Sequence, residues 1–271
     1  MLQKIEATTK YILEKTKFKG NTAVILGSGL GNFANQIEAE HVLEYKNIPN
    51  FPVSTVEGHS GELIFGKFRG KNIVAMKGRF HFYEGYQMEE VTFPIRVFKQ
   101  MGITNLLVSN AAGGINLNFK VGDVMMITDH INFFGTNPLI GKNDNQMGPR
   151  FPDMSKAYHP DLCQIARSFA KANGITLHEG TYVGLTGPSF ETPSEYRFLN
   201  IIGGDAVGMS TVPEVIVANH MGMKVFGMSV ITNNGLAISD AGNQHAEVLD
   251  IATLAAPKLE ALFGQIIEMV G

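Results

Sequence analysis

The sequence is short of cysteine, tryptophan and long apolar runs. Among its 271 residues Cys163 is the one cysteine, and there is no tryptophan. A single cysteine cannot form an internal disulfide, which indicates a reducing compartment, and its place in an expected helix favours a buried, inert thiol. No apolar run approaches the ~20 residues of a membrane span. Lys4, Glu6 and Lys10 interrupt the N-terminal segment, so it does not resemble a secretion signal. We expect a soluble, cytoplasmic protein.

The sequence also lacks a strong charge excess of either sign. Lysine and arginine number 22 against 25 acidic residues, for a net charge of −3, and no basic cluster is present. Binding to a nucleic-acid backbone needs a basic surface, so nucleic acid is not an expected partner. With 44% hydrophobic and 17% charged residues, the chain has the composition of an ordinary globular domain rather than a disordered one.

Cofactor and metal motifs are missing as well. The loop 27–31 begins as G-x-G, but Asn32 stands where a dinucleotide fingerprint has glycine, and the segment 48–52 lacks the expected acidic residue. No G-K-[ST], H-E-x-x-H or G-x-S-x-G motif occurs, and one cysteine cannot build a cysteine-based zinc site. The sequence therefore predicts no metal, no cofactor and no covalent serine mechanism.

Helical and strand patterns alternate from end to end, without an internal repeat or a linker. The spacing predicts helices over 2–17, 91–101, 161–173 and 244–270, and strands over 23–26, 62–68, 72–76, 103–108, 124–131, 175–185 and 224–231. The second and third of these strands form a hairpin. The segment 133–159 is polar and rich in Gly, Pro and Asn, and its length is typical of a functional or interface loop. We predict one α/β domain over residues 1–271.

Small polar residues follow several of the expected strands, at 109–110, 209–210 and 232–233. Open α/β sheets bind ligands beyond the carboxyl ends of their strands, so this pattern predicts one composite site. Thr211, followed three residues later by Glu214, predicts a capped helix start directly beside that site.

Two segments are suited to an anion. The strand 23–26 opens into a glycine-rich loop, where backbone N–H groups and the Ser28 hydroxyl can close on a small anion at a helix N-terminus. Taken alone, this loop is equally well a tight turn. Arg79 and His81 lie two residues apart after a strand, so both can point the same way and donate to phosphate. Each alone is also explained as a surface ion pair or a core histidine, but together with the Ser28 loop they favour a phosphate site.

Two further segments carry polar and aromatic side chains. In 187–192, Phe190 beside Glu191 suits a purine, because the ring can stack and the carboxylate can accept from ring N–H groups. The alternative is an ordinary turn before a helix that begins at Pro193. The segment 208–211 offers hydroxyl groups to an anion, or else only caps its own helix.

These segments, read in order, resemble a known family. The resemblance to the trimeric, low-molecular-mass purine nucleoside phosphorylases is carried by residues 23–31, 58–61, 78–83, 110–113, 187–192, 208–217 and 231–233. It implies a single three-layer α/β/α domain around a central mixed, partly barrel-like sheet. It also implies a homotrimer that reversibly cleaves 6-oxopurine nucleosides and deoxynucleosides, in purine salvage. The products are the free base and a pentose 1-phosphate, and phosphate is a co-substrate.

The resemblance assigns roles to individual positions. It implies a phosphate site of Ser28, His59, Arg79, His81, the Ala111 backbone and Ser210. It implies a purine site of Phe190, Glu191, Val207 and Asn233, and ribose contacts from Tyr83, Met209, His245 and Phe151. In this assignment His81, Glu191 and Asn233 are the catalytic residues, His245 lies near the 5′-hydroxyl, and Phe151 is supplied by a neighbouring subunit.

Several alternatives stay open on the sequence. Asn233 favours 6-oxopurines, whereas methylthioadenosine-cleaving relatives carry Asp at the matching position, and xanthosine-preferring relatives share many of the motifs. The segment 234–245 departs from the mammalian pattern and resembles bacterial members, which bears on the role of His245. The alternatives from other classes are a dehydrogenase and a non-catalytic module that binds purine or phosphate.

Overall fold

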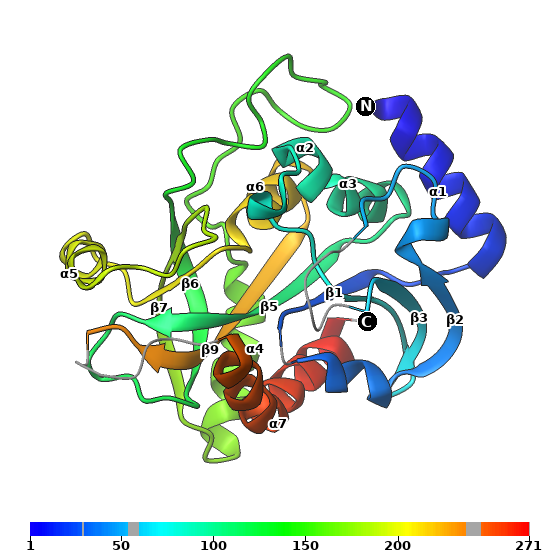
Figure 1. Ribbon diagram of the computed structural model, residues 1–271. Coiled ribbons are helices and arrows are strands. Elements are labelled where there is room, and N and C mark those ends of the chain that lie inside the picture. Colours follow the sequence, from blue (N-terminus) through cyan, green and yellow to red (C-terminus); the bar gives the residue numbers. More distant parts are fainter. Residues whose placement is uncertain (29, 54–59, 237–244, 271) are drawn as a thin grey trace.

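The computed structural model describes residues 1–28, 30–53, 60–236 and 245–270 (Figure 1). Its α-helices are α1 (Leu2–Thr16), α2 (Met88–Val91), α3 (Phe93–Gln100), α4 (Pro160–Ala172), α5 (Pro193–Ile201), α6 (Val212–His220) and α7 (His245–Val270). Short 3₁₀ helices are η1 (Gly31–Gln36), η2 (Tyr45–Asn47) and η3 (Phe82–Glu84). The strands are β1 (Thr22–Leu26), β2 (Glu38–Glu44), β3 (Glu62–Phe68), β4 (Lys71–Lys77), β5 (Asn105–Gly114), β6 (Val124–Asn132), β7 (Leu177–Gly184), β8 (Ala206–Gly208) and β9 (Lys224–Asn234).

The strands form one mixed sheet in the order β2-β3-β4-β1-β5-β8-β7-β6-β9, and β9 also pairs with β5. The run from β5 through β8, β7, β6 and β9 therefore closes on itself as a five-stranded barrel, while β1 to β4 extend from it as an open sheet. Strand β1 lies parallel to both β4 and β5. The expected mixed, partly barrel-like sheet is confirmed.

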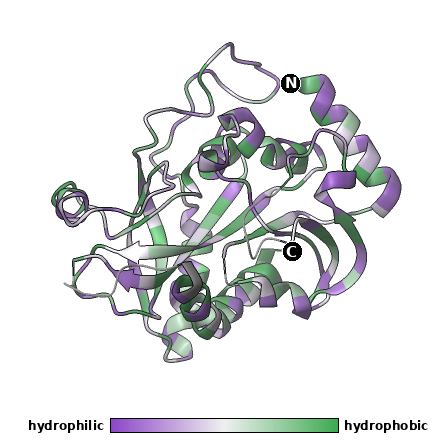
Figure 2. Cartoon of the chain, viewed as in Figure 1, coloured by the Kyte–Doolittle hydropathy of each residue, from purple (hydrophilic) through white to green (hydrophobic). Residues whose placement is uncertain are grey.

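Helices cover the sheet on both faces, as Figure 1 shows. On one face α3 packs against α1 and α6, and on the other α7 packs against α4, β5 and β9. All five residues of β1 are buried, as expected for a short parallel strand covered on both faces. Hydrophobic residues are concentrated along the central strands, and hydrophilic ones along α1 and the segment between β6 and α4 (Figure 2). These layers confirm the three-layer architecture.

The hairpin of β3 and β4 turns at Arg69 and Gly70, which both have positive φ, 47° and 78°. A two-residue turn with positive φ at both positions has the twist that joins antiparallel strands, which confirms the predicted hairpin. The segment 133–159 is free of helix and strand, also as predicted. None of the helices in the described ranges is long and apolar enough to cross a membrane.

Two expectations about elements are wrong, and one strand was not expected. The strand expected over 103–108 continues to Gly114, because pairing with β9 and β8 extends it through small residues that have weak strand preference by themselves. The helix expected over 91–101 is divided at Thr92, one residue before the Phe93-Pro94 start of α3, because proline cannot donate a helical hydrogen bond. Strand β2 has no apolar alternation, since almost all of its residues are exposed, so the sequence did not indicate it.

Candidate active site

One cavity of about 300 Å³ lies at the carboxyl ends of β1, β4 and β9 and beside β5 and β8. It is lined by most of the residues that the sequence singled out: Ser28, Arg79, His81, Tyr83, Ala111, Phe190, Glu191, Val207, Met209, Ser210 and Asn233. These residues come from segments that are up to about two hundred positions apart in the chain, so the predicted composite site is formed by the fold.

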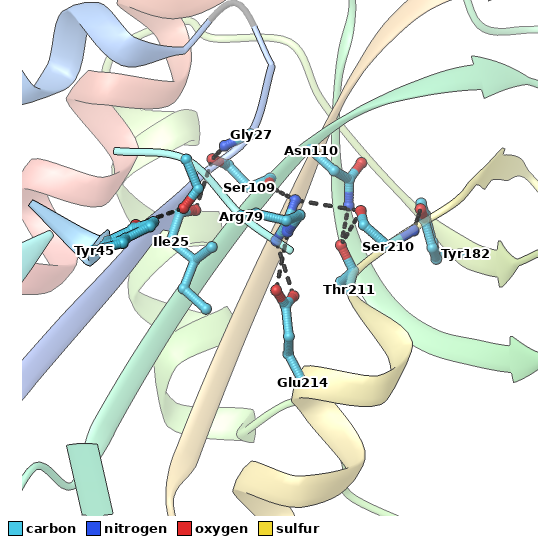
Figure 3. Close-up of polar contacts among 11 residues, drawn as sticks. Ile25, Gly27, Tyr45, Arg79, Ser109, Asn110, Tyr182, Ser210, Thr211 and Glu214 are labelled. Atoms are coloured by element: carbon cyan, nitrogen blue, oxygen red, sulfur yellow. Dashed lines mark hydrogen bonds and ion pairs between the residues drawn. The ribbon is translucent and has the colours of Figure 1, made fainter. Parts of the chain in front are cut away.

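Arg79 lies at the cavity wall and is almost fully buried. Its Nε and Nη2 donate to the two carboxylate oxygens of Glu214, each over 2.9 Å, and the exposed fractions of the two residues are 1% and 4%. Its Nη1 donates to the Ser109 carbonyl at 2.8 Å and to the Ser210 hydroxyl at 3.2 Å (Figure 3). A buried cation needs such a partner, and the two-point geometry also fixes the plane of the guanidinium.

The start of α6 differs from the predicted capped helix. Thr211 has φ 70°, and its side chain makes no capping hydrogen bond. Its hydroxyl accepts from Asn110 Nδ2 at 2.9 Å and lies 3.1 Å from the Ser210 hydroxyl, while Glu214 is bound to Arg79 (Figure 3). A β-branched residue with positive φ costs on the order of 1–3 kcal/mol, so these tertiary contacts hold the loop in a shape that local preference opposes.

Ser109 anchors the loop that carries Ser28. Its hydroxyl donates to the Ile25 carbonyl at 3.1 Å and accepts from the Gly27 N–H at 3.2 Å. A Cβ at Gly27 would lie 2.7 Å from the Asn110 Cα, so only glycine fits there. The loop leads into the six-residue 3₁₀ helix η1 and not into an α-helix. The helix that was expected after the loop is thus a short 3₁₀ helix, because the glycine- and asparagine-rich segment has weak α-helix preference.

His81 is held by Glu84. The Glu84 Oε1 accepts from the His81 backbone N–H and lies 3.1 Å from Nδ1. Burial lowers the pKa of His81 most, and the hydrogen bond to Glu84 opposes that shift. A neutral ring that donates from Nδ1 to a carboxylate has its acceptor at Nε2. Tyr83 stacks on His81 with ring centroids 4.7 Å apart, and burial raises its pKa to about 12.

A second group of residues in the cavity wall has an aromatic ring, a carboxylate and an amide. Phe190 is 42% exposed, and Val207 is buried at the end of the barrel on β8. Burial raises the pKa of Glu191, and hydrogen bonds from its own backbone and from Tyr196 oppose that rise. Asn233 Nδ2 donates to the Tyr196 hydroxyl at 3.2 Å. Hydrogen-bond donors and acceptors therefore both lie in this part of the cavity wall.

Similarity to known proteins identifies the family of this chain. Residues 21–268 match the phosphorylase superfamily. The chain is 54% identical to purine nucleoside phosphorylase 1 of Bacillus subtilis, over 93% of either chain. It belongs to the purine nucleoside phosphorylase family. Membership in this family of enzymes rules out the dehydrogenase and the non-catalytic module as alternatives.

Two solved purine nucleoside phosphorylases show the same fold. The Schistosoma mansoni protein in complex with adenosine has a TM-score of 0.94 at 42% identity, covering 99% of this chain and 98% of that one. The schistosoma protein in complex with hypoxanthine has a TM-score of 0.94 at 41% identity, with the same coverage.

Three further residues of the expected site have still to be placed. His59 lies outside the described residues. His245 is the first residue of α7 and its side chain is not described, but Val248, one turn further on, lines the cavity. Phe151 is 87% exposed in the segment between β6 and α4, beside Arg150.

The sequence did not predict the residues that hold those of the expected site in position. Ser109, Glu84, Glu214 and Tyr196 each hold a residue of the expected site. The Arg79–Glu214 contact joins positions 135 residues apart, and the Asn233–Tyr196 contact joins positions 37 apart. No spacing rule finds such pairs. The sequence signal at Glu214 even indicated a different role, that of a helix cap.

Proposed function

We propose that this phosphorylase cleaves 6-oxopurine nucleosides, with phosphate and the base bound at opposite ends of the one cavity. The observation that supports this best is the distribution of its lining side chains. Arg79 and Ser210 are hydrogen-bonded to each other and, with His81, offer the groups that suit phosphate, whereas Glu191 and Asn233 both contact Tyr196 and offer the groups that can read a purine edge. Ligand cavities of this kind combine an apolar lining with a few convergent polar groups.

At the phosphate end, the ligands are Ser28, Arg79, His81, the Ala111 backbone and Ser210, with His59 as a further candidate. Glu214 orients Arg79 before phosphate arrives, so little reorganisation is needed on binding. Because Nδ1 of His81 is held by Glu84, Nε2 of the neutral ring is suited to accept from a phosphate hydroxyl.

The reaction breaks the bond between the anomeric carbon and N9 of the base and forms a bond from that carbon to a phosphate oxygen. The transition state resembles an oxocarbenium ion, so the phosphate below the sugar balances positive charge on the ribose. Electrons of the broken bond go to the purine, where Asn233 stabilises them at N7 by hydrogen bonding. Phosphate is the nucleophile, and no protein nucleophile is required.

The base end selects the 6-oxopurine. The ionised carboxylate of Glu191 accepts from the N1–H, and the Asn233 amide donates to the acceptors O6 and N7, while Phe190 and Val207 pack against the ring. Methylthioadenosine-cleaving relatives carry Asp in place of Asn233, and this difference favours inosine and guanosine as substrates here. One solved structure of a relative contains adenosine and another contains hypoxanthine, so the fold accommodates a 6-aminopurine as well as a 6-oxopurine.

The residues that we propose for ribose binding include one from a neighbouring subunit. Tyr83 and Met209 lie in the cavity wall, and we place His245 near the 5′-hydroxyl because Val248 on the same helix lines the cavity. Phe151 is 87% exposed in the single chain, and a neighbouring chain of a homotrimer would cover it. We expect this trimer to work in the cytoplasm, in purine salvage.

One assay tests the proposal. Purified enzyme is given inosine, guanosine, xanthosine, methylthioadenosine or adenosine, each with and without phosphate, and base release is followed. We expect hypoxanthine and guanine release that depends on phosphate. Release without phosphate would identify a hydrolase, and faster cleavage of xanthosine or methylthioadenosine would move the enzyme to one of those specificities.

A further inference from the structure

Tyr196 lies at the base end of the cavity, on α5, and is only 3% exposed. Two glycines leave the space that it occupies. A Cβ at Gly235 would lie 2.0 Å from a carbon of its ring, and a Cβ at Gly113 would lie 3.1 Å from its hydroxyl oxygen. The phenol is therefore clamped between β5 and the turn after β9, with its hydroxyl directed at the cavity wall.

The Tyr196 hydroxyl connects the two groups that we assign to the purine edge. It accepts from Asn233 Nδ2 at 3.2 Å, and it is placed so that it lowers the pKa of the Glu191 carboxyl. A phenol has one proton. When that proton is donated to the Glu191 carboxylate, the oxygen can only accept from Asn233, so the amide must turn its nitrogen and not its oxygen toward Tyr196.

We propose that Tyr196 is a positioning residue for base selection, whose hydroxyl fixes both Glu191 and Asn233 in the states that favour a 6-oxopurine over a 6-aminopurine. This inference rests on the proposed function, in which Glu191 and Asn233 read the base.

The chemistry of the two purine edges supports the selection. A 6-oxopurine has an N1–H donor and an O6 acceptor, whereas a 6-aminopurine has an N1 acceptor and an amino donor. An ionised Glu191 accepts from the N1–H of a 6-oxopurine and repels the N1 lone pair of a 6-aminopurine. An amide that is prevented from rotating keeps its second N–H available, to be shared between O6 and N7, whereas a free amide can turn its oxygen to the amino group. The one hydroxyl therefore acts on both readers in the same direction.

Tyr196 also acts on the protonation of Glu191. Burial raises the pKa of that carboxyl, the neighbouring Glu195 raises it further, and the hydrogen bond from Tyr196 lowers it. Without the hydroxyl, the pKa of Glu191 rises. The ionised form that accepts from N1–H is then lost at a higher pH.

The test is Tyr196→Phe, which keeps the ring and removes the hydroxyl. We expect kcat/KM for inosine to fall about ten-fold and the inosine-to-adenosine ratio of kcat/KM to fall at least as much, since the variant leaves a buried N–H of Asn233 without its acceptor. The acidic limb of the kcat/KM profile for inosine should move to higher pH. Calorimetric binding of hypoxanthine and adenine should show the same loss of selectivity without requiring turnover.

Tyr158→Phe is the matched control, because Tyr158 is also buried and its hydroxyl lies 3.2 Å from His130 Nδ1, away from the cavity. It should change neither the ratio nor the pH profile. A Tyr196→Phe enzyme with the wild-type base ratio, or with an unmoved acidic limb, overturns the inference. An Asn233→Ala enzyme with the wild-type rate would instead refute the base-reading assignment, so the two failures are distinguishable.

Discussion

Glu214 holds the guanidinium of Arg79 at two points, with both carboxylate oxygens 2.9 Å from a guanidinium nitrogen and both side chains buried. The cation of the proposed phosphate site is thus fixed by a residue on another element, α6, before any ligand is bound. This relationship makes the phosphate end sensitive to a side chain that need not touch phosphate.

Glu214→Ala should destabilise the protein and weaken phosphate binding. Removing one partner of a buried ion pair costs about 3–5 kcal/mol, because the remaining charge is uncompensated. Urea unfolding measures the loss, and KM for phosphate should rise. Added phosphate should restore part of the stability, since it supplies a new partner for Arg79.

The control is Glu179→Ala, which removes a two-point ion pair with Arg167 whose side chains are 39% exposed. It should cost at most about 1 kcal/mol, and equal losses in the two variants would contradict the prediction.

Ser109→Ala should raise KM for phosphate. The variant leaves the Gly27 N–H without the Ser109 hydroxyl, at a cost of about 1–3 kcal/mol, and loosens the loop that presents Ser28. Steady-state kinetics with phosphate varied at saturating inosine measure the effect. Ser229→Ala is matched to it, because Ser229 is equally buried and its hydroxyl has no hydrogen-bond partner within the described part of the chain. An unchanged KM in Ser109→Ala would show that the loop holds its shape without this anchor.

Asn233→Ala should lower kcat strongly. Loss of one preorganised donor at a developing charge costs about 10²–10³ in kcat. Rates of hypoxanthine release at saturating inosine and phosphate measure it. Asn234→Ala is a suitable control, because Asn234 follows on the same strand and does not line the cavity. A near-unchanged kcat in Asn233→Ala would refute the leaving-group role.

Phe151→Ala should raise KM for the nucleoside without loss of stability, because this side chain is 87% exposed in one chain. The sharper experiment mixes subunits. Trimers assembled from Phe151→Ala and Asn233→Ala chains contain sites in which an intact Asn233 faces an intact Phe151 from a neighbour. Such mixtures should regain activity above the sum of the two separate variants, with sedimentation used to verify the trimer. Purely additive activity would place Phe151 outside the neighbour's site.

The stability of the protein should fall as the pH decreases through about 6.5, the ordinary pKa of histidine. Burial lowers the pKa values of His81 and His130 in the folded state. The unfolded chain therefore binds more protons in this range, and the free energy of unfolding rises with pH there. Urea titrations at about pH 6 and about pH 7.5 measure the difference. His81→Asn should reduce the difference between these two pH values, by at most about 0.8 kcal/mol for an ordinary pKa of about 6.5. A pH dependence identical to that of the wild type would mean that the fold does not lower the pKa of His81.

The sequence by itself determined the alternation of helices and strands, the hairpin at Arg69-Gly70 and the identity of most residues around the cavity. The alternation and the hairpin depend on local information, as do some of the cavity residues, whereas Tyr83, Ala111, Val207 and Met209 were assigned through the resemblance to a family. Apolar periodicity, glycine in turns and short motifs at strand ends all act within a few residues of chain.

Only the tertiary structure decided how those residues are held. The extension of β5 to Gly114 needs β9 and β8 beside it, and the positive φ of Thr211 needs Asn110 from another strand. Glu214 has the spacing of a helix cap, yet it binds Arg79, because a buried guanidinium gains more from a carboxylate than a helix end does. Contacts between distant positions depend on the packing of whole elements, and such packing leaves no periodic signal in the sequence.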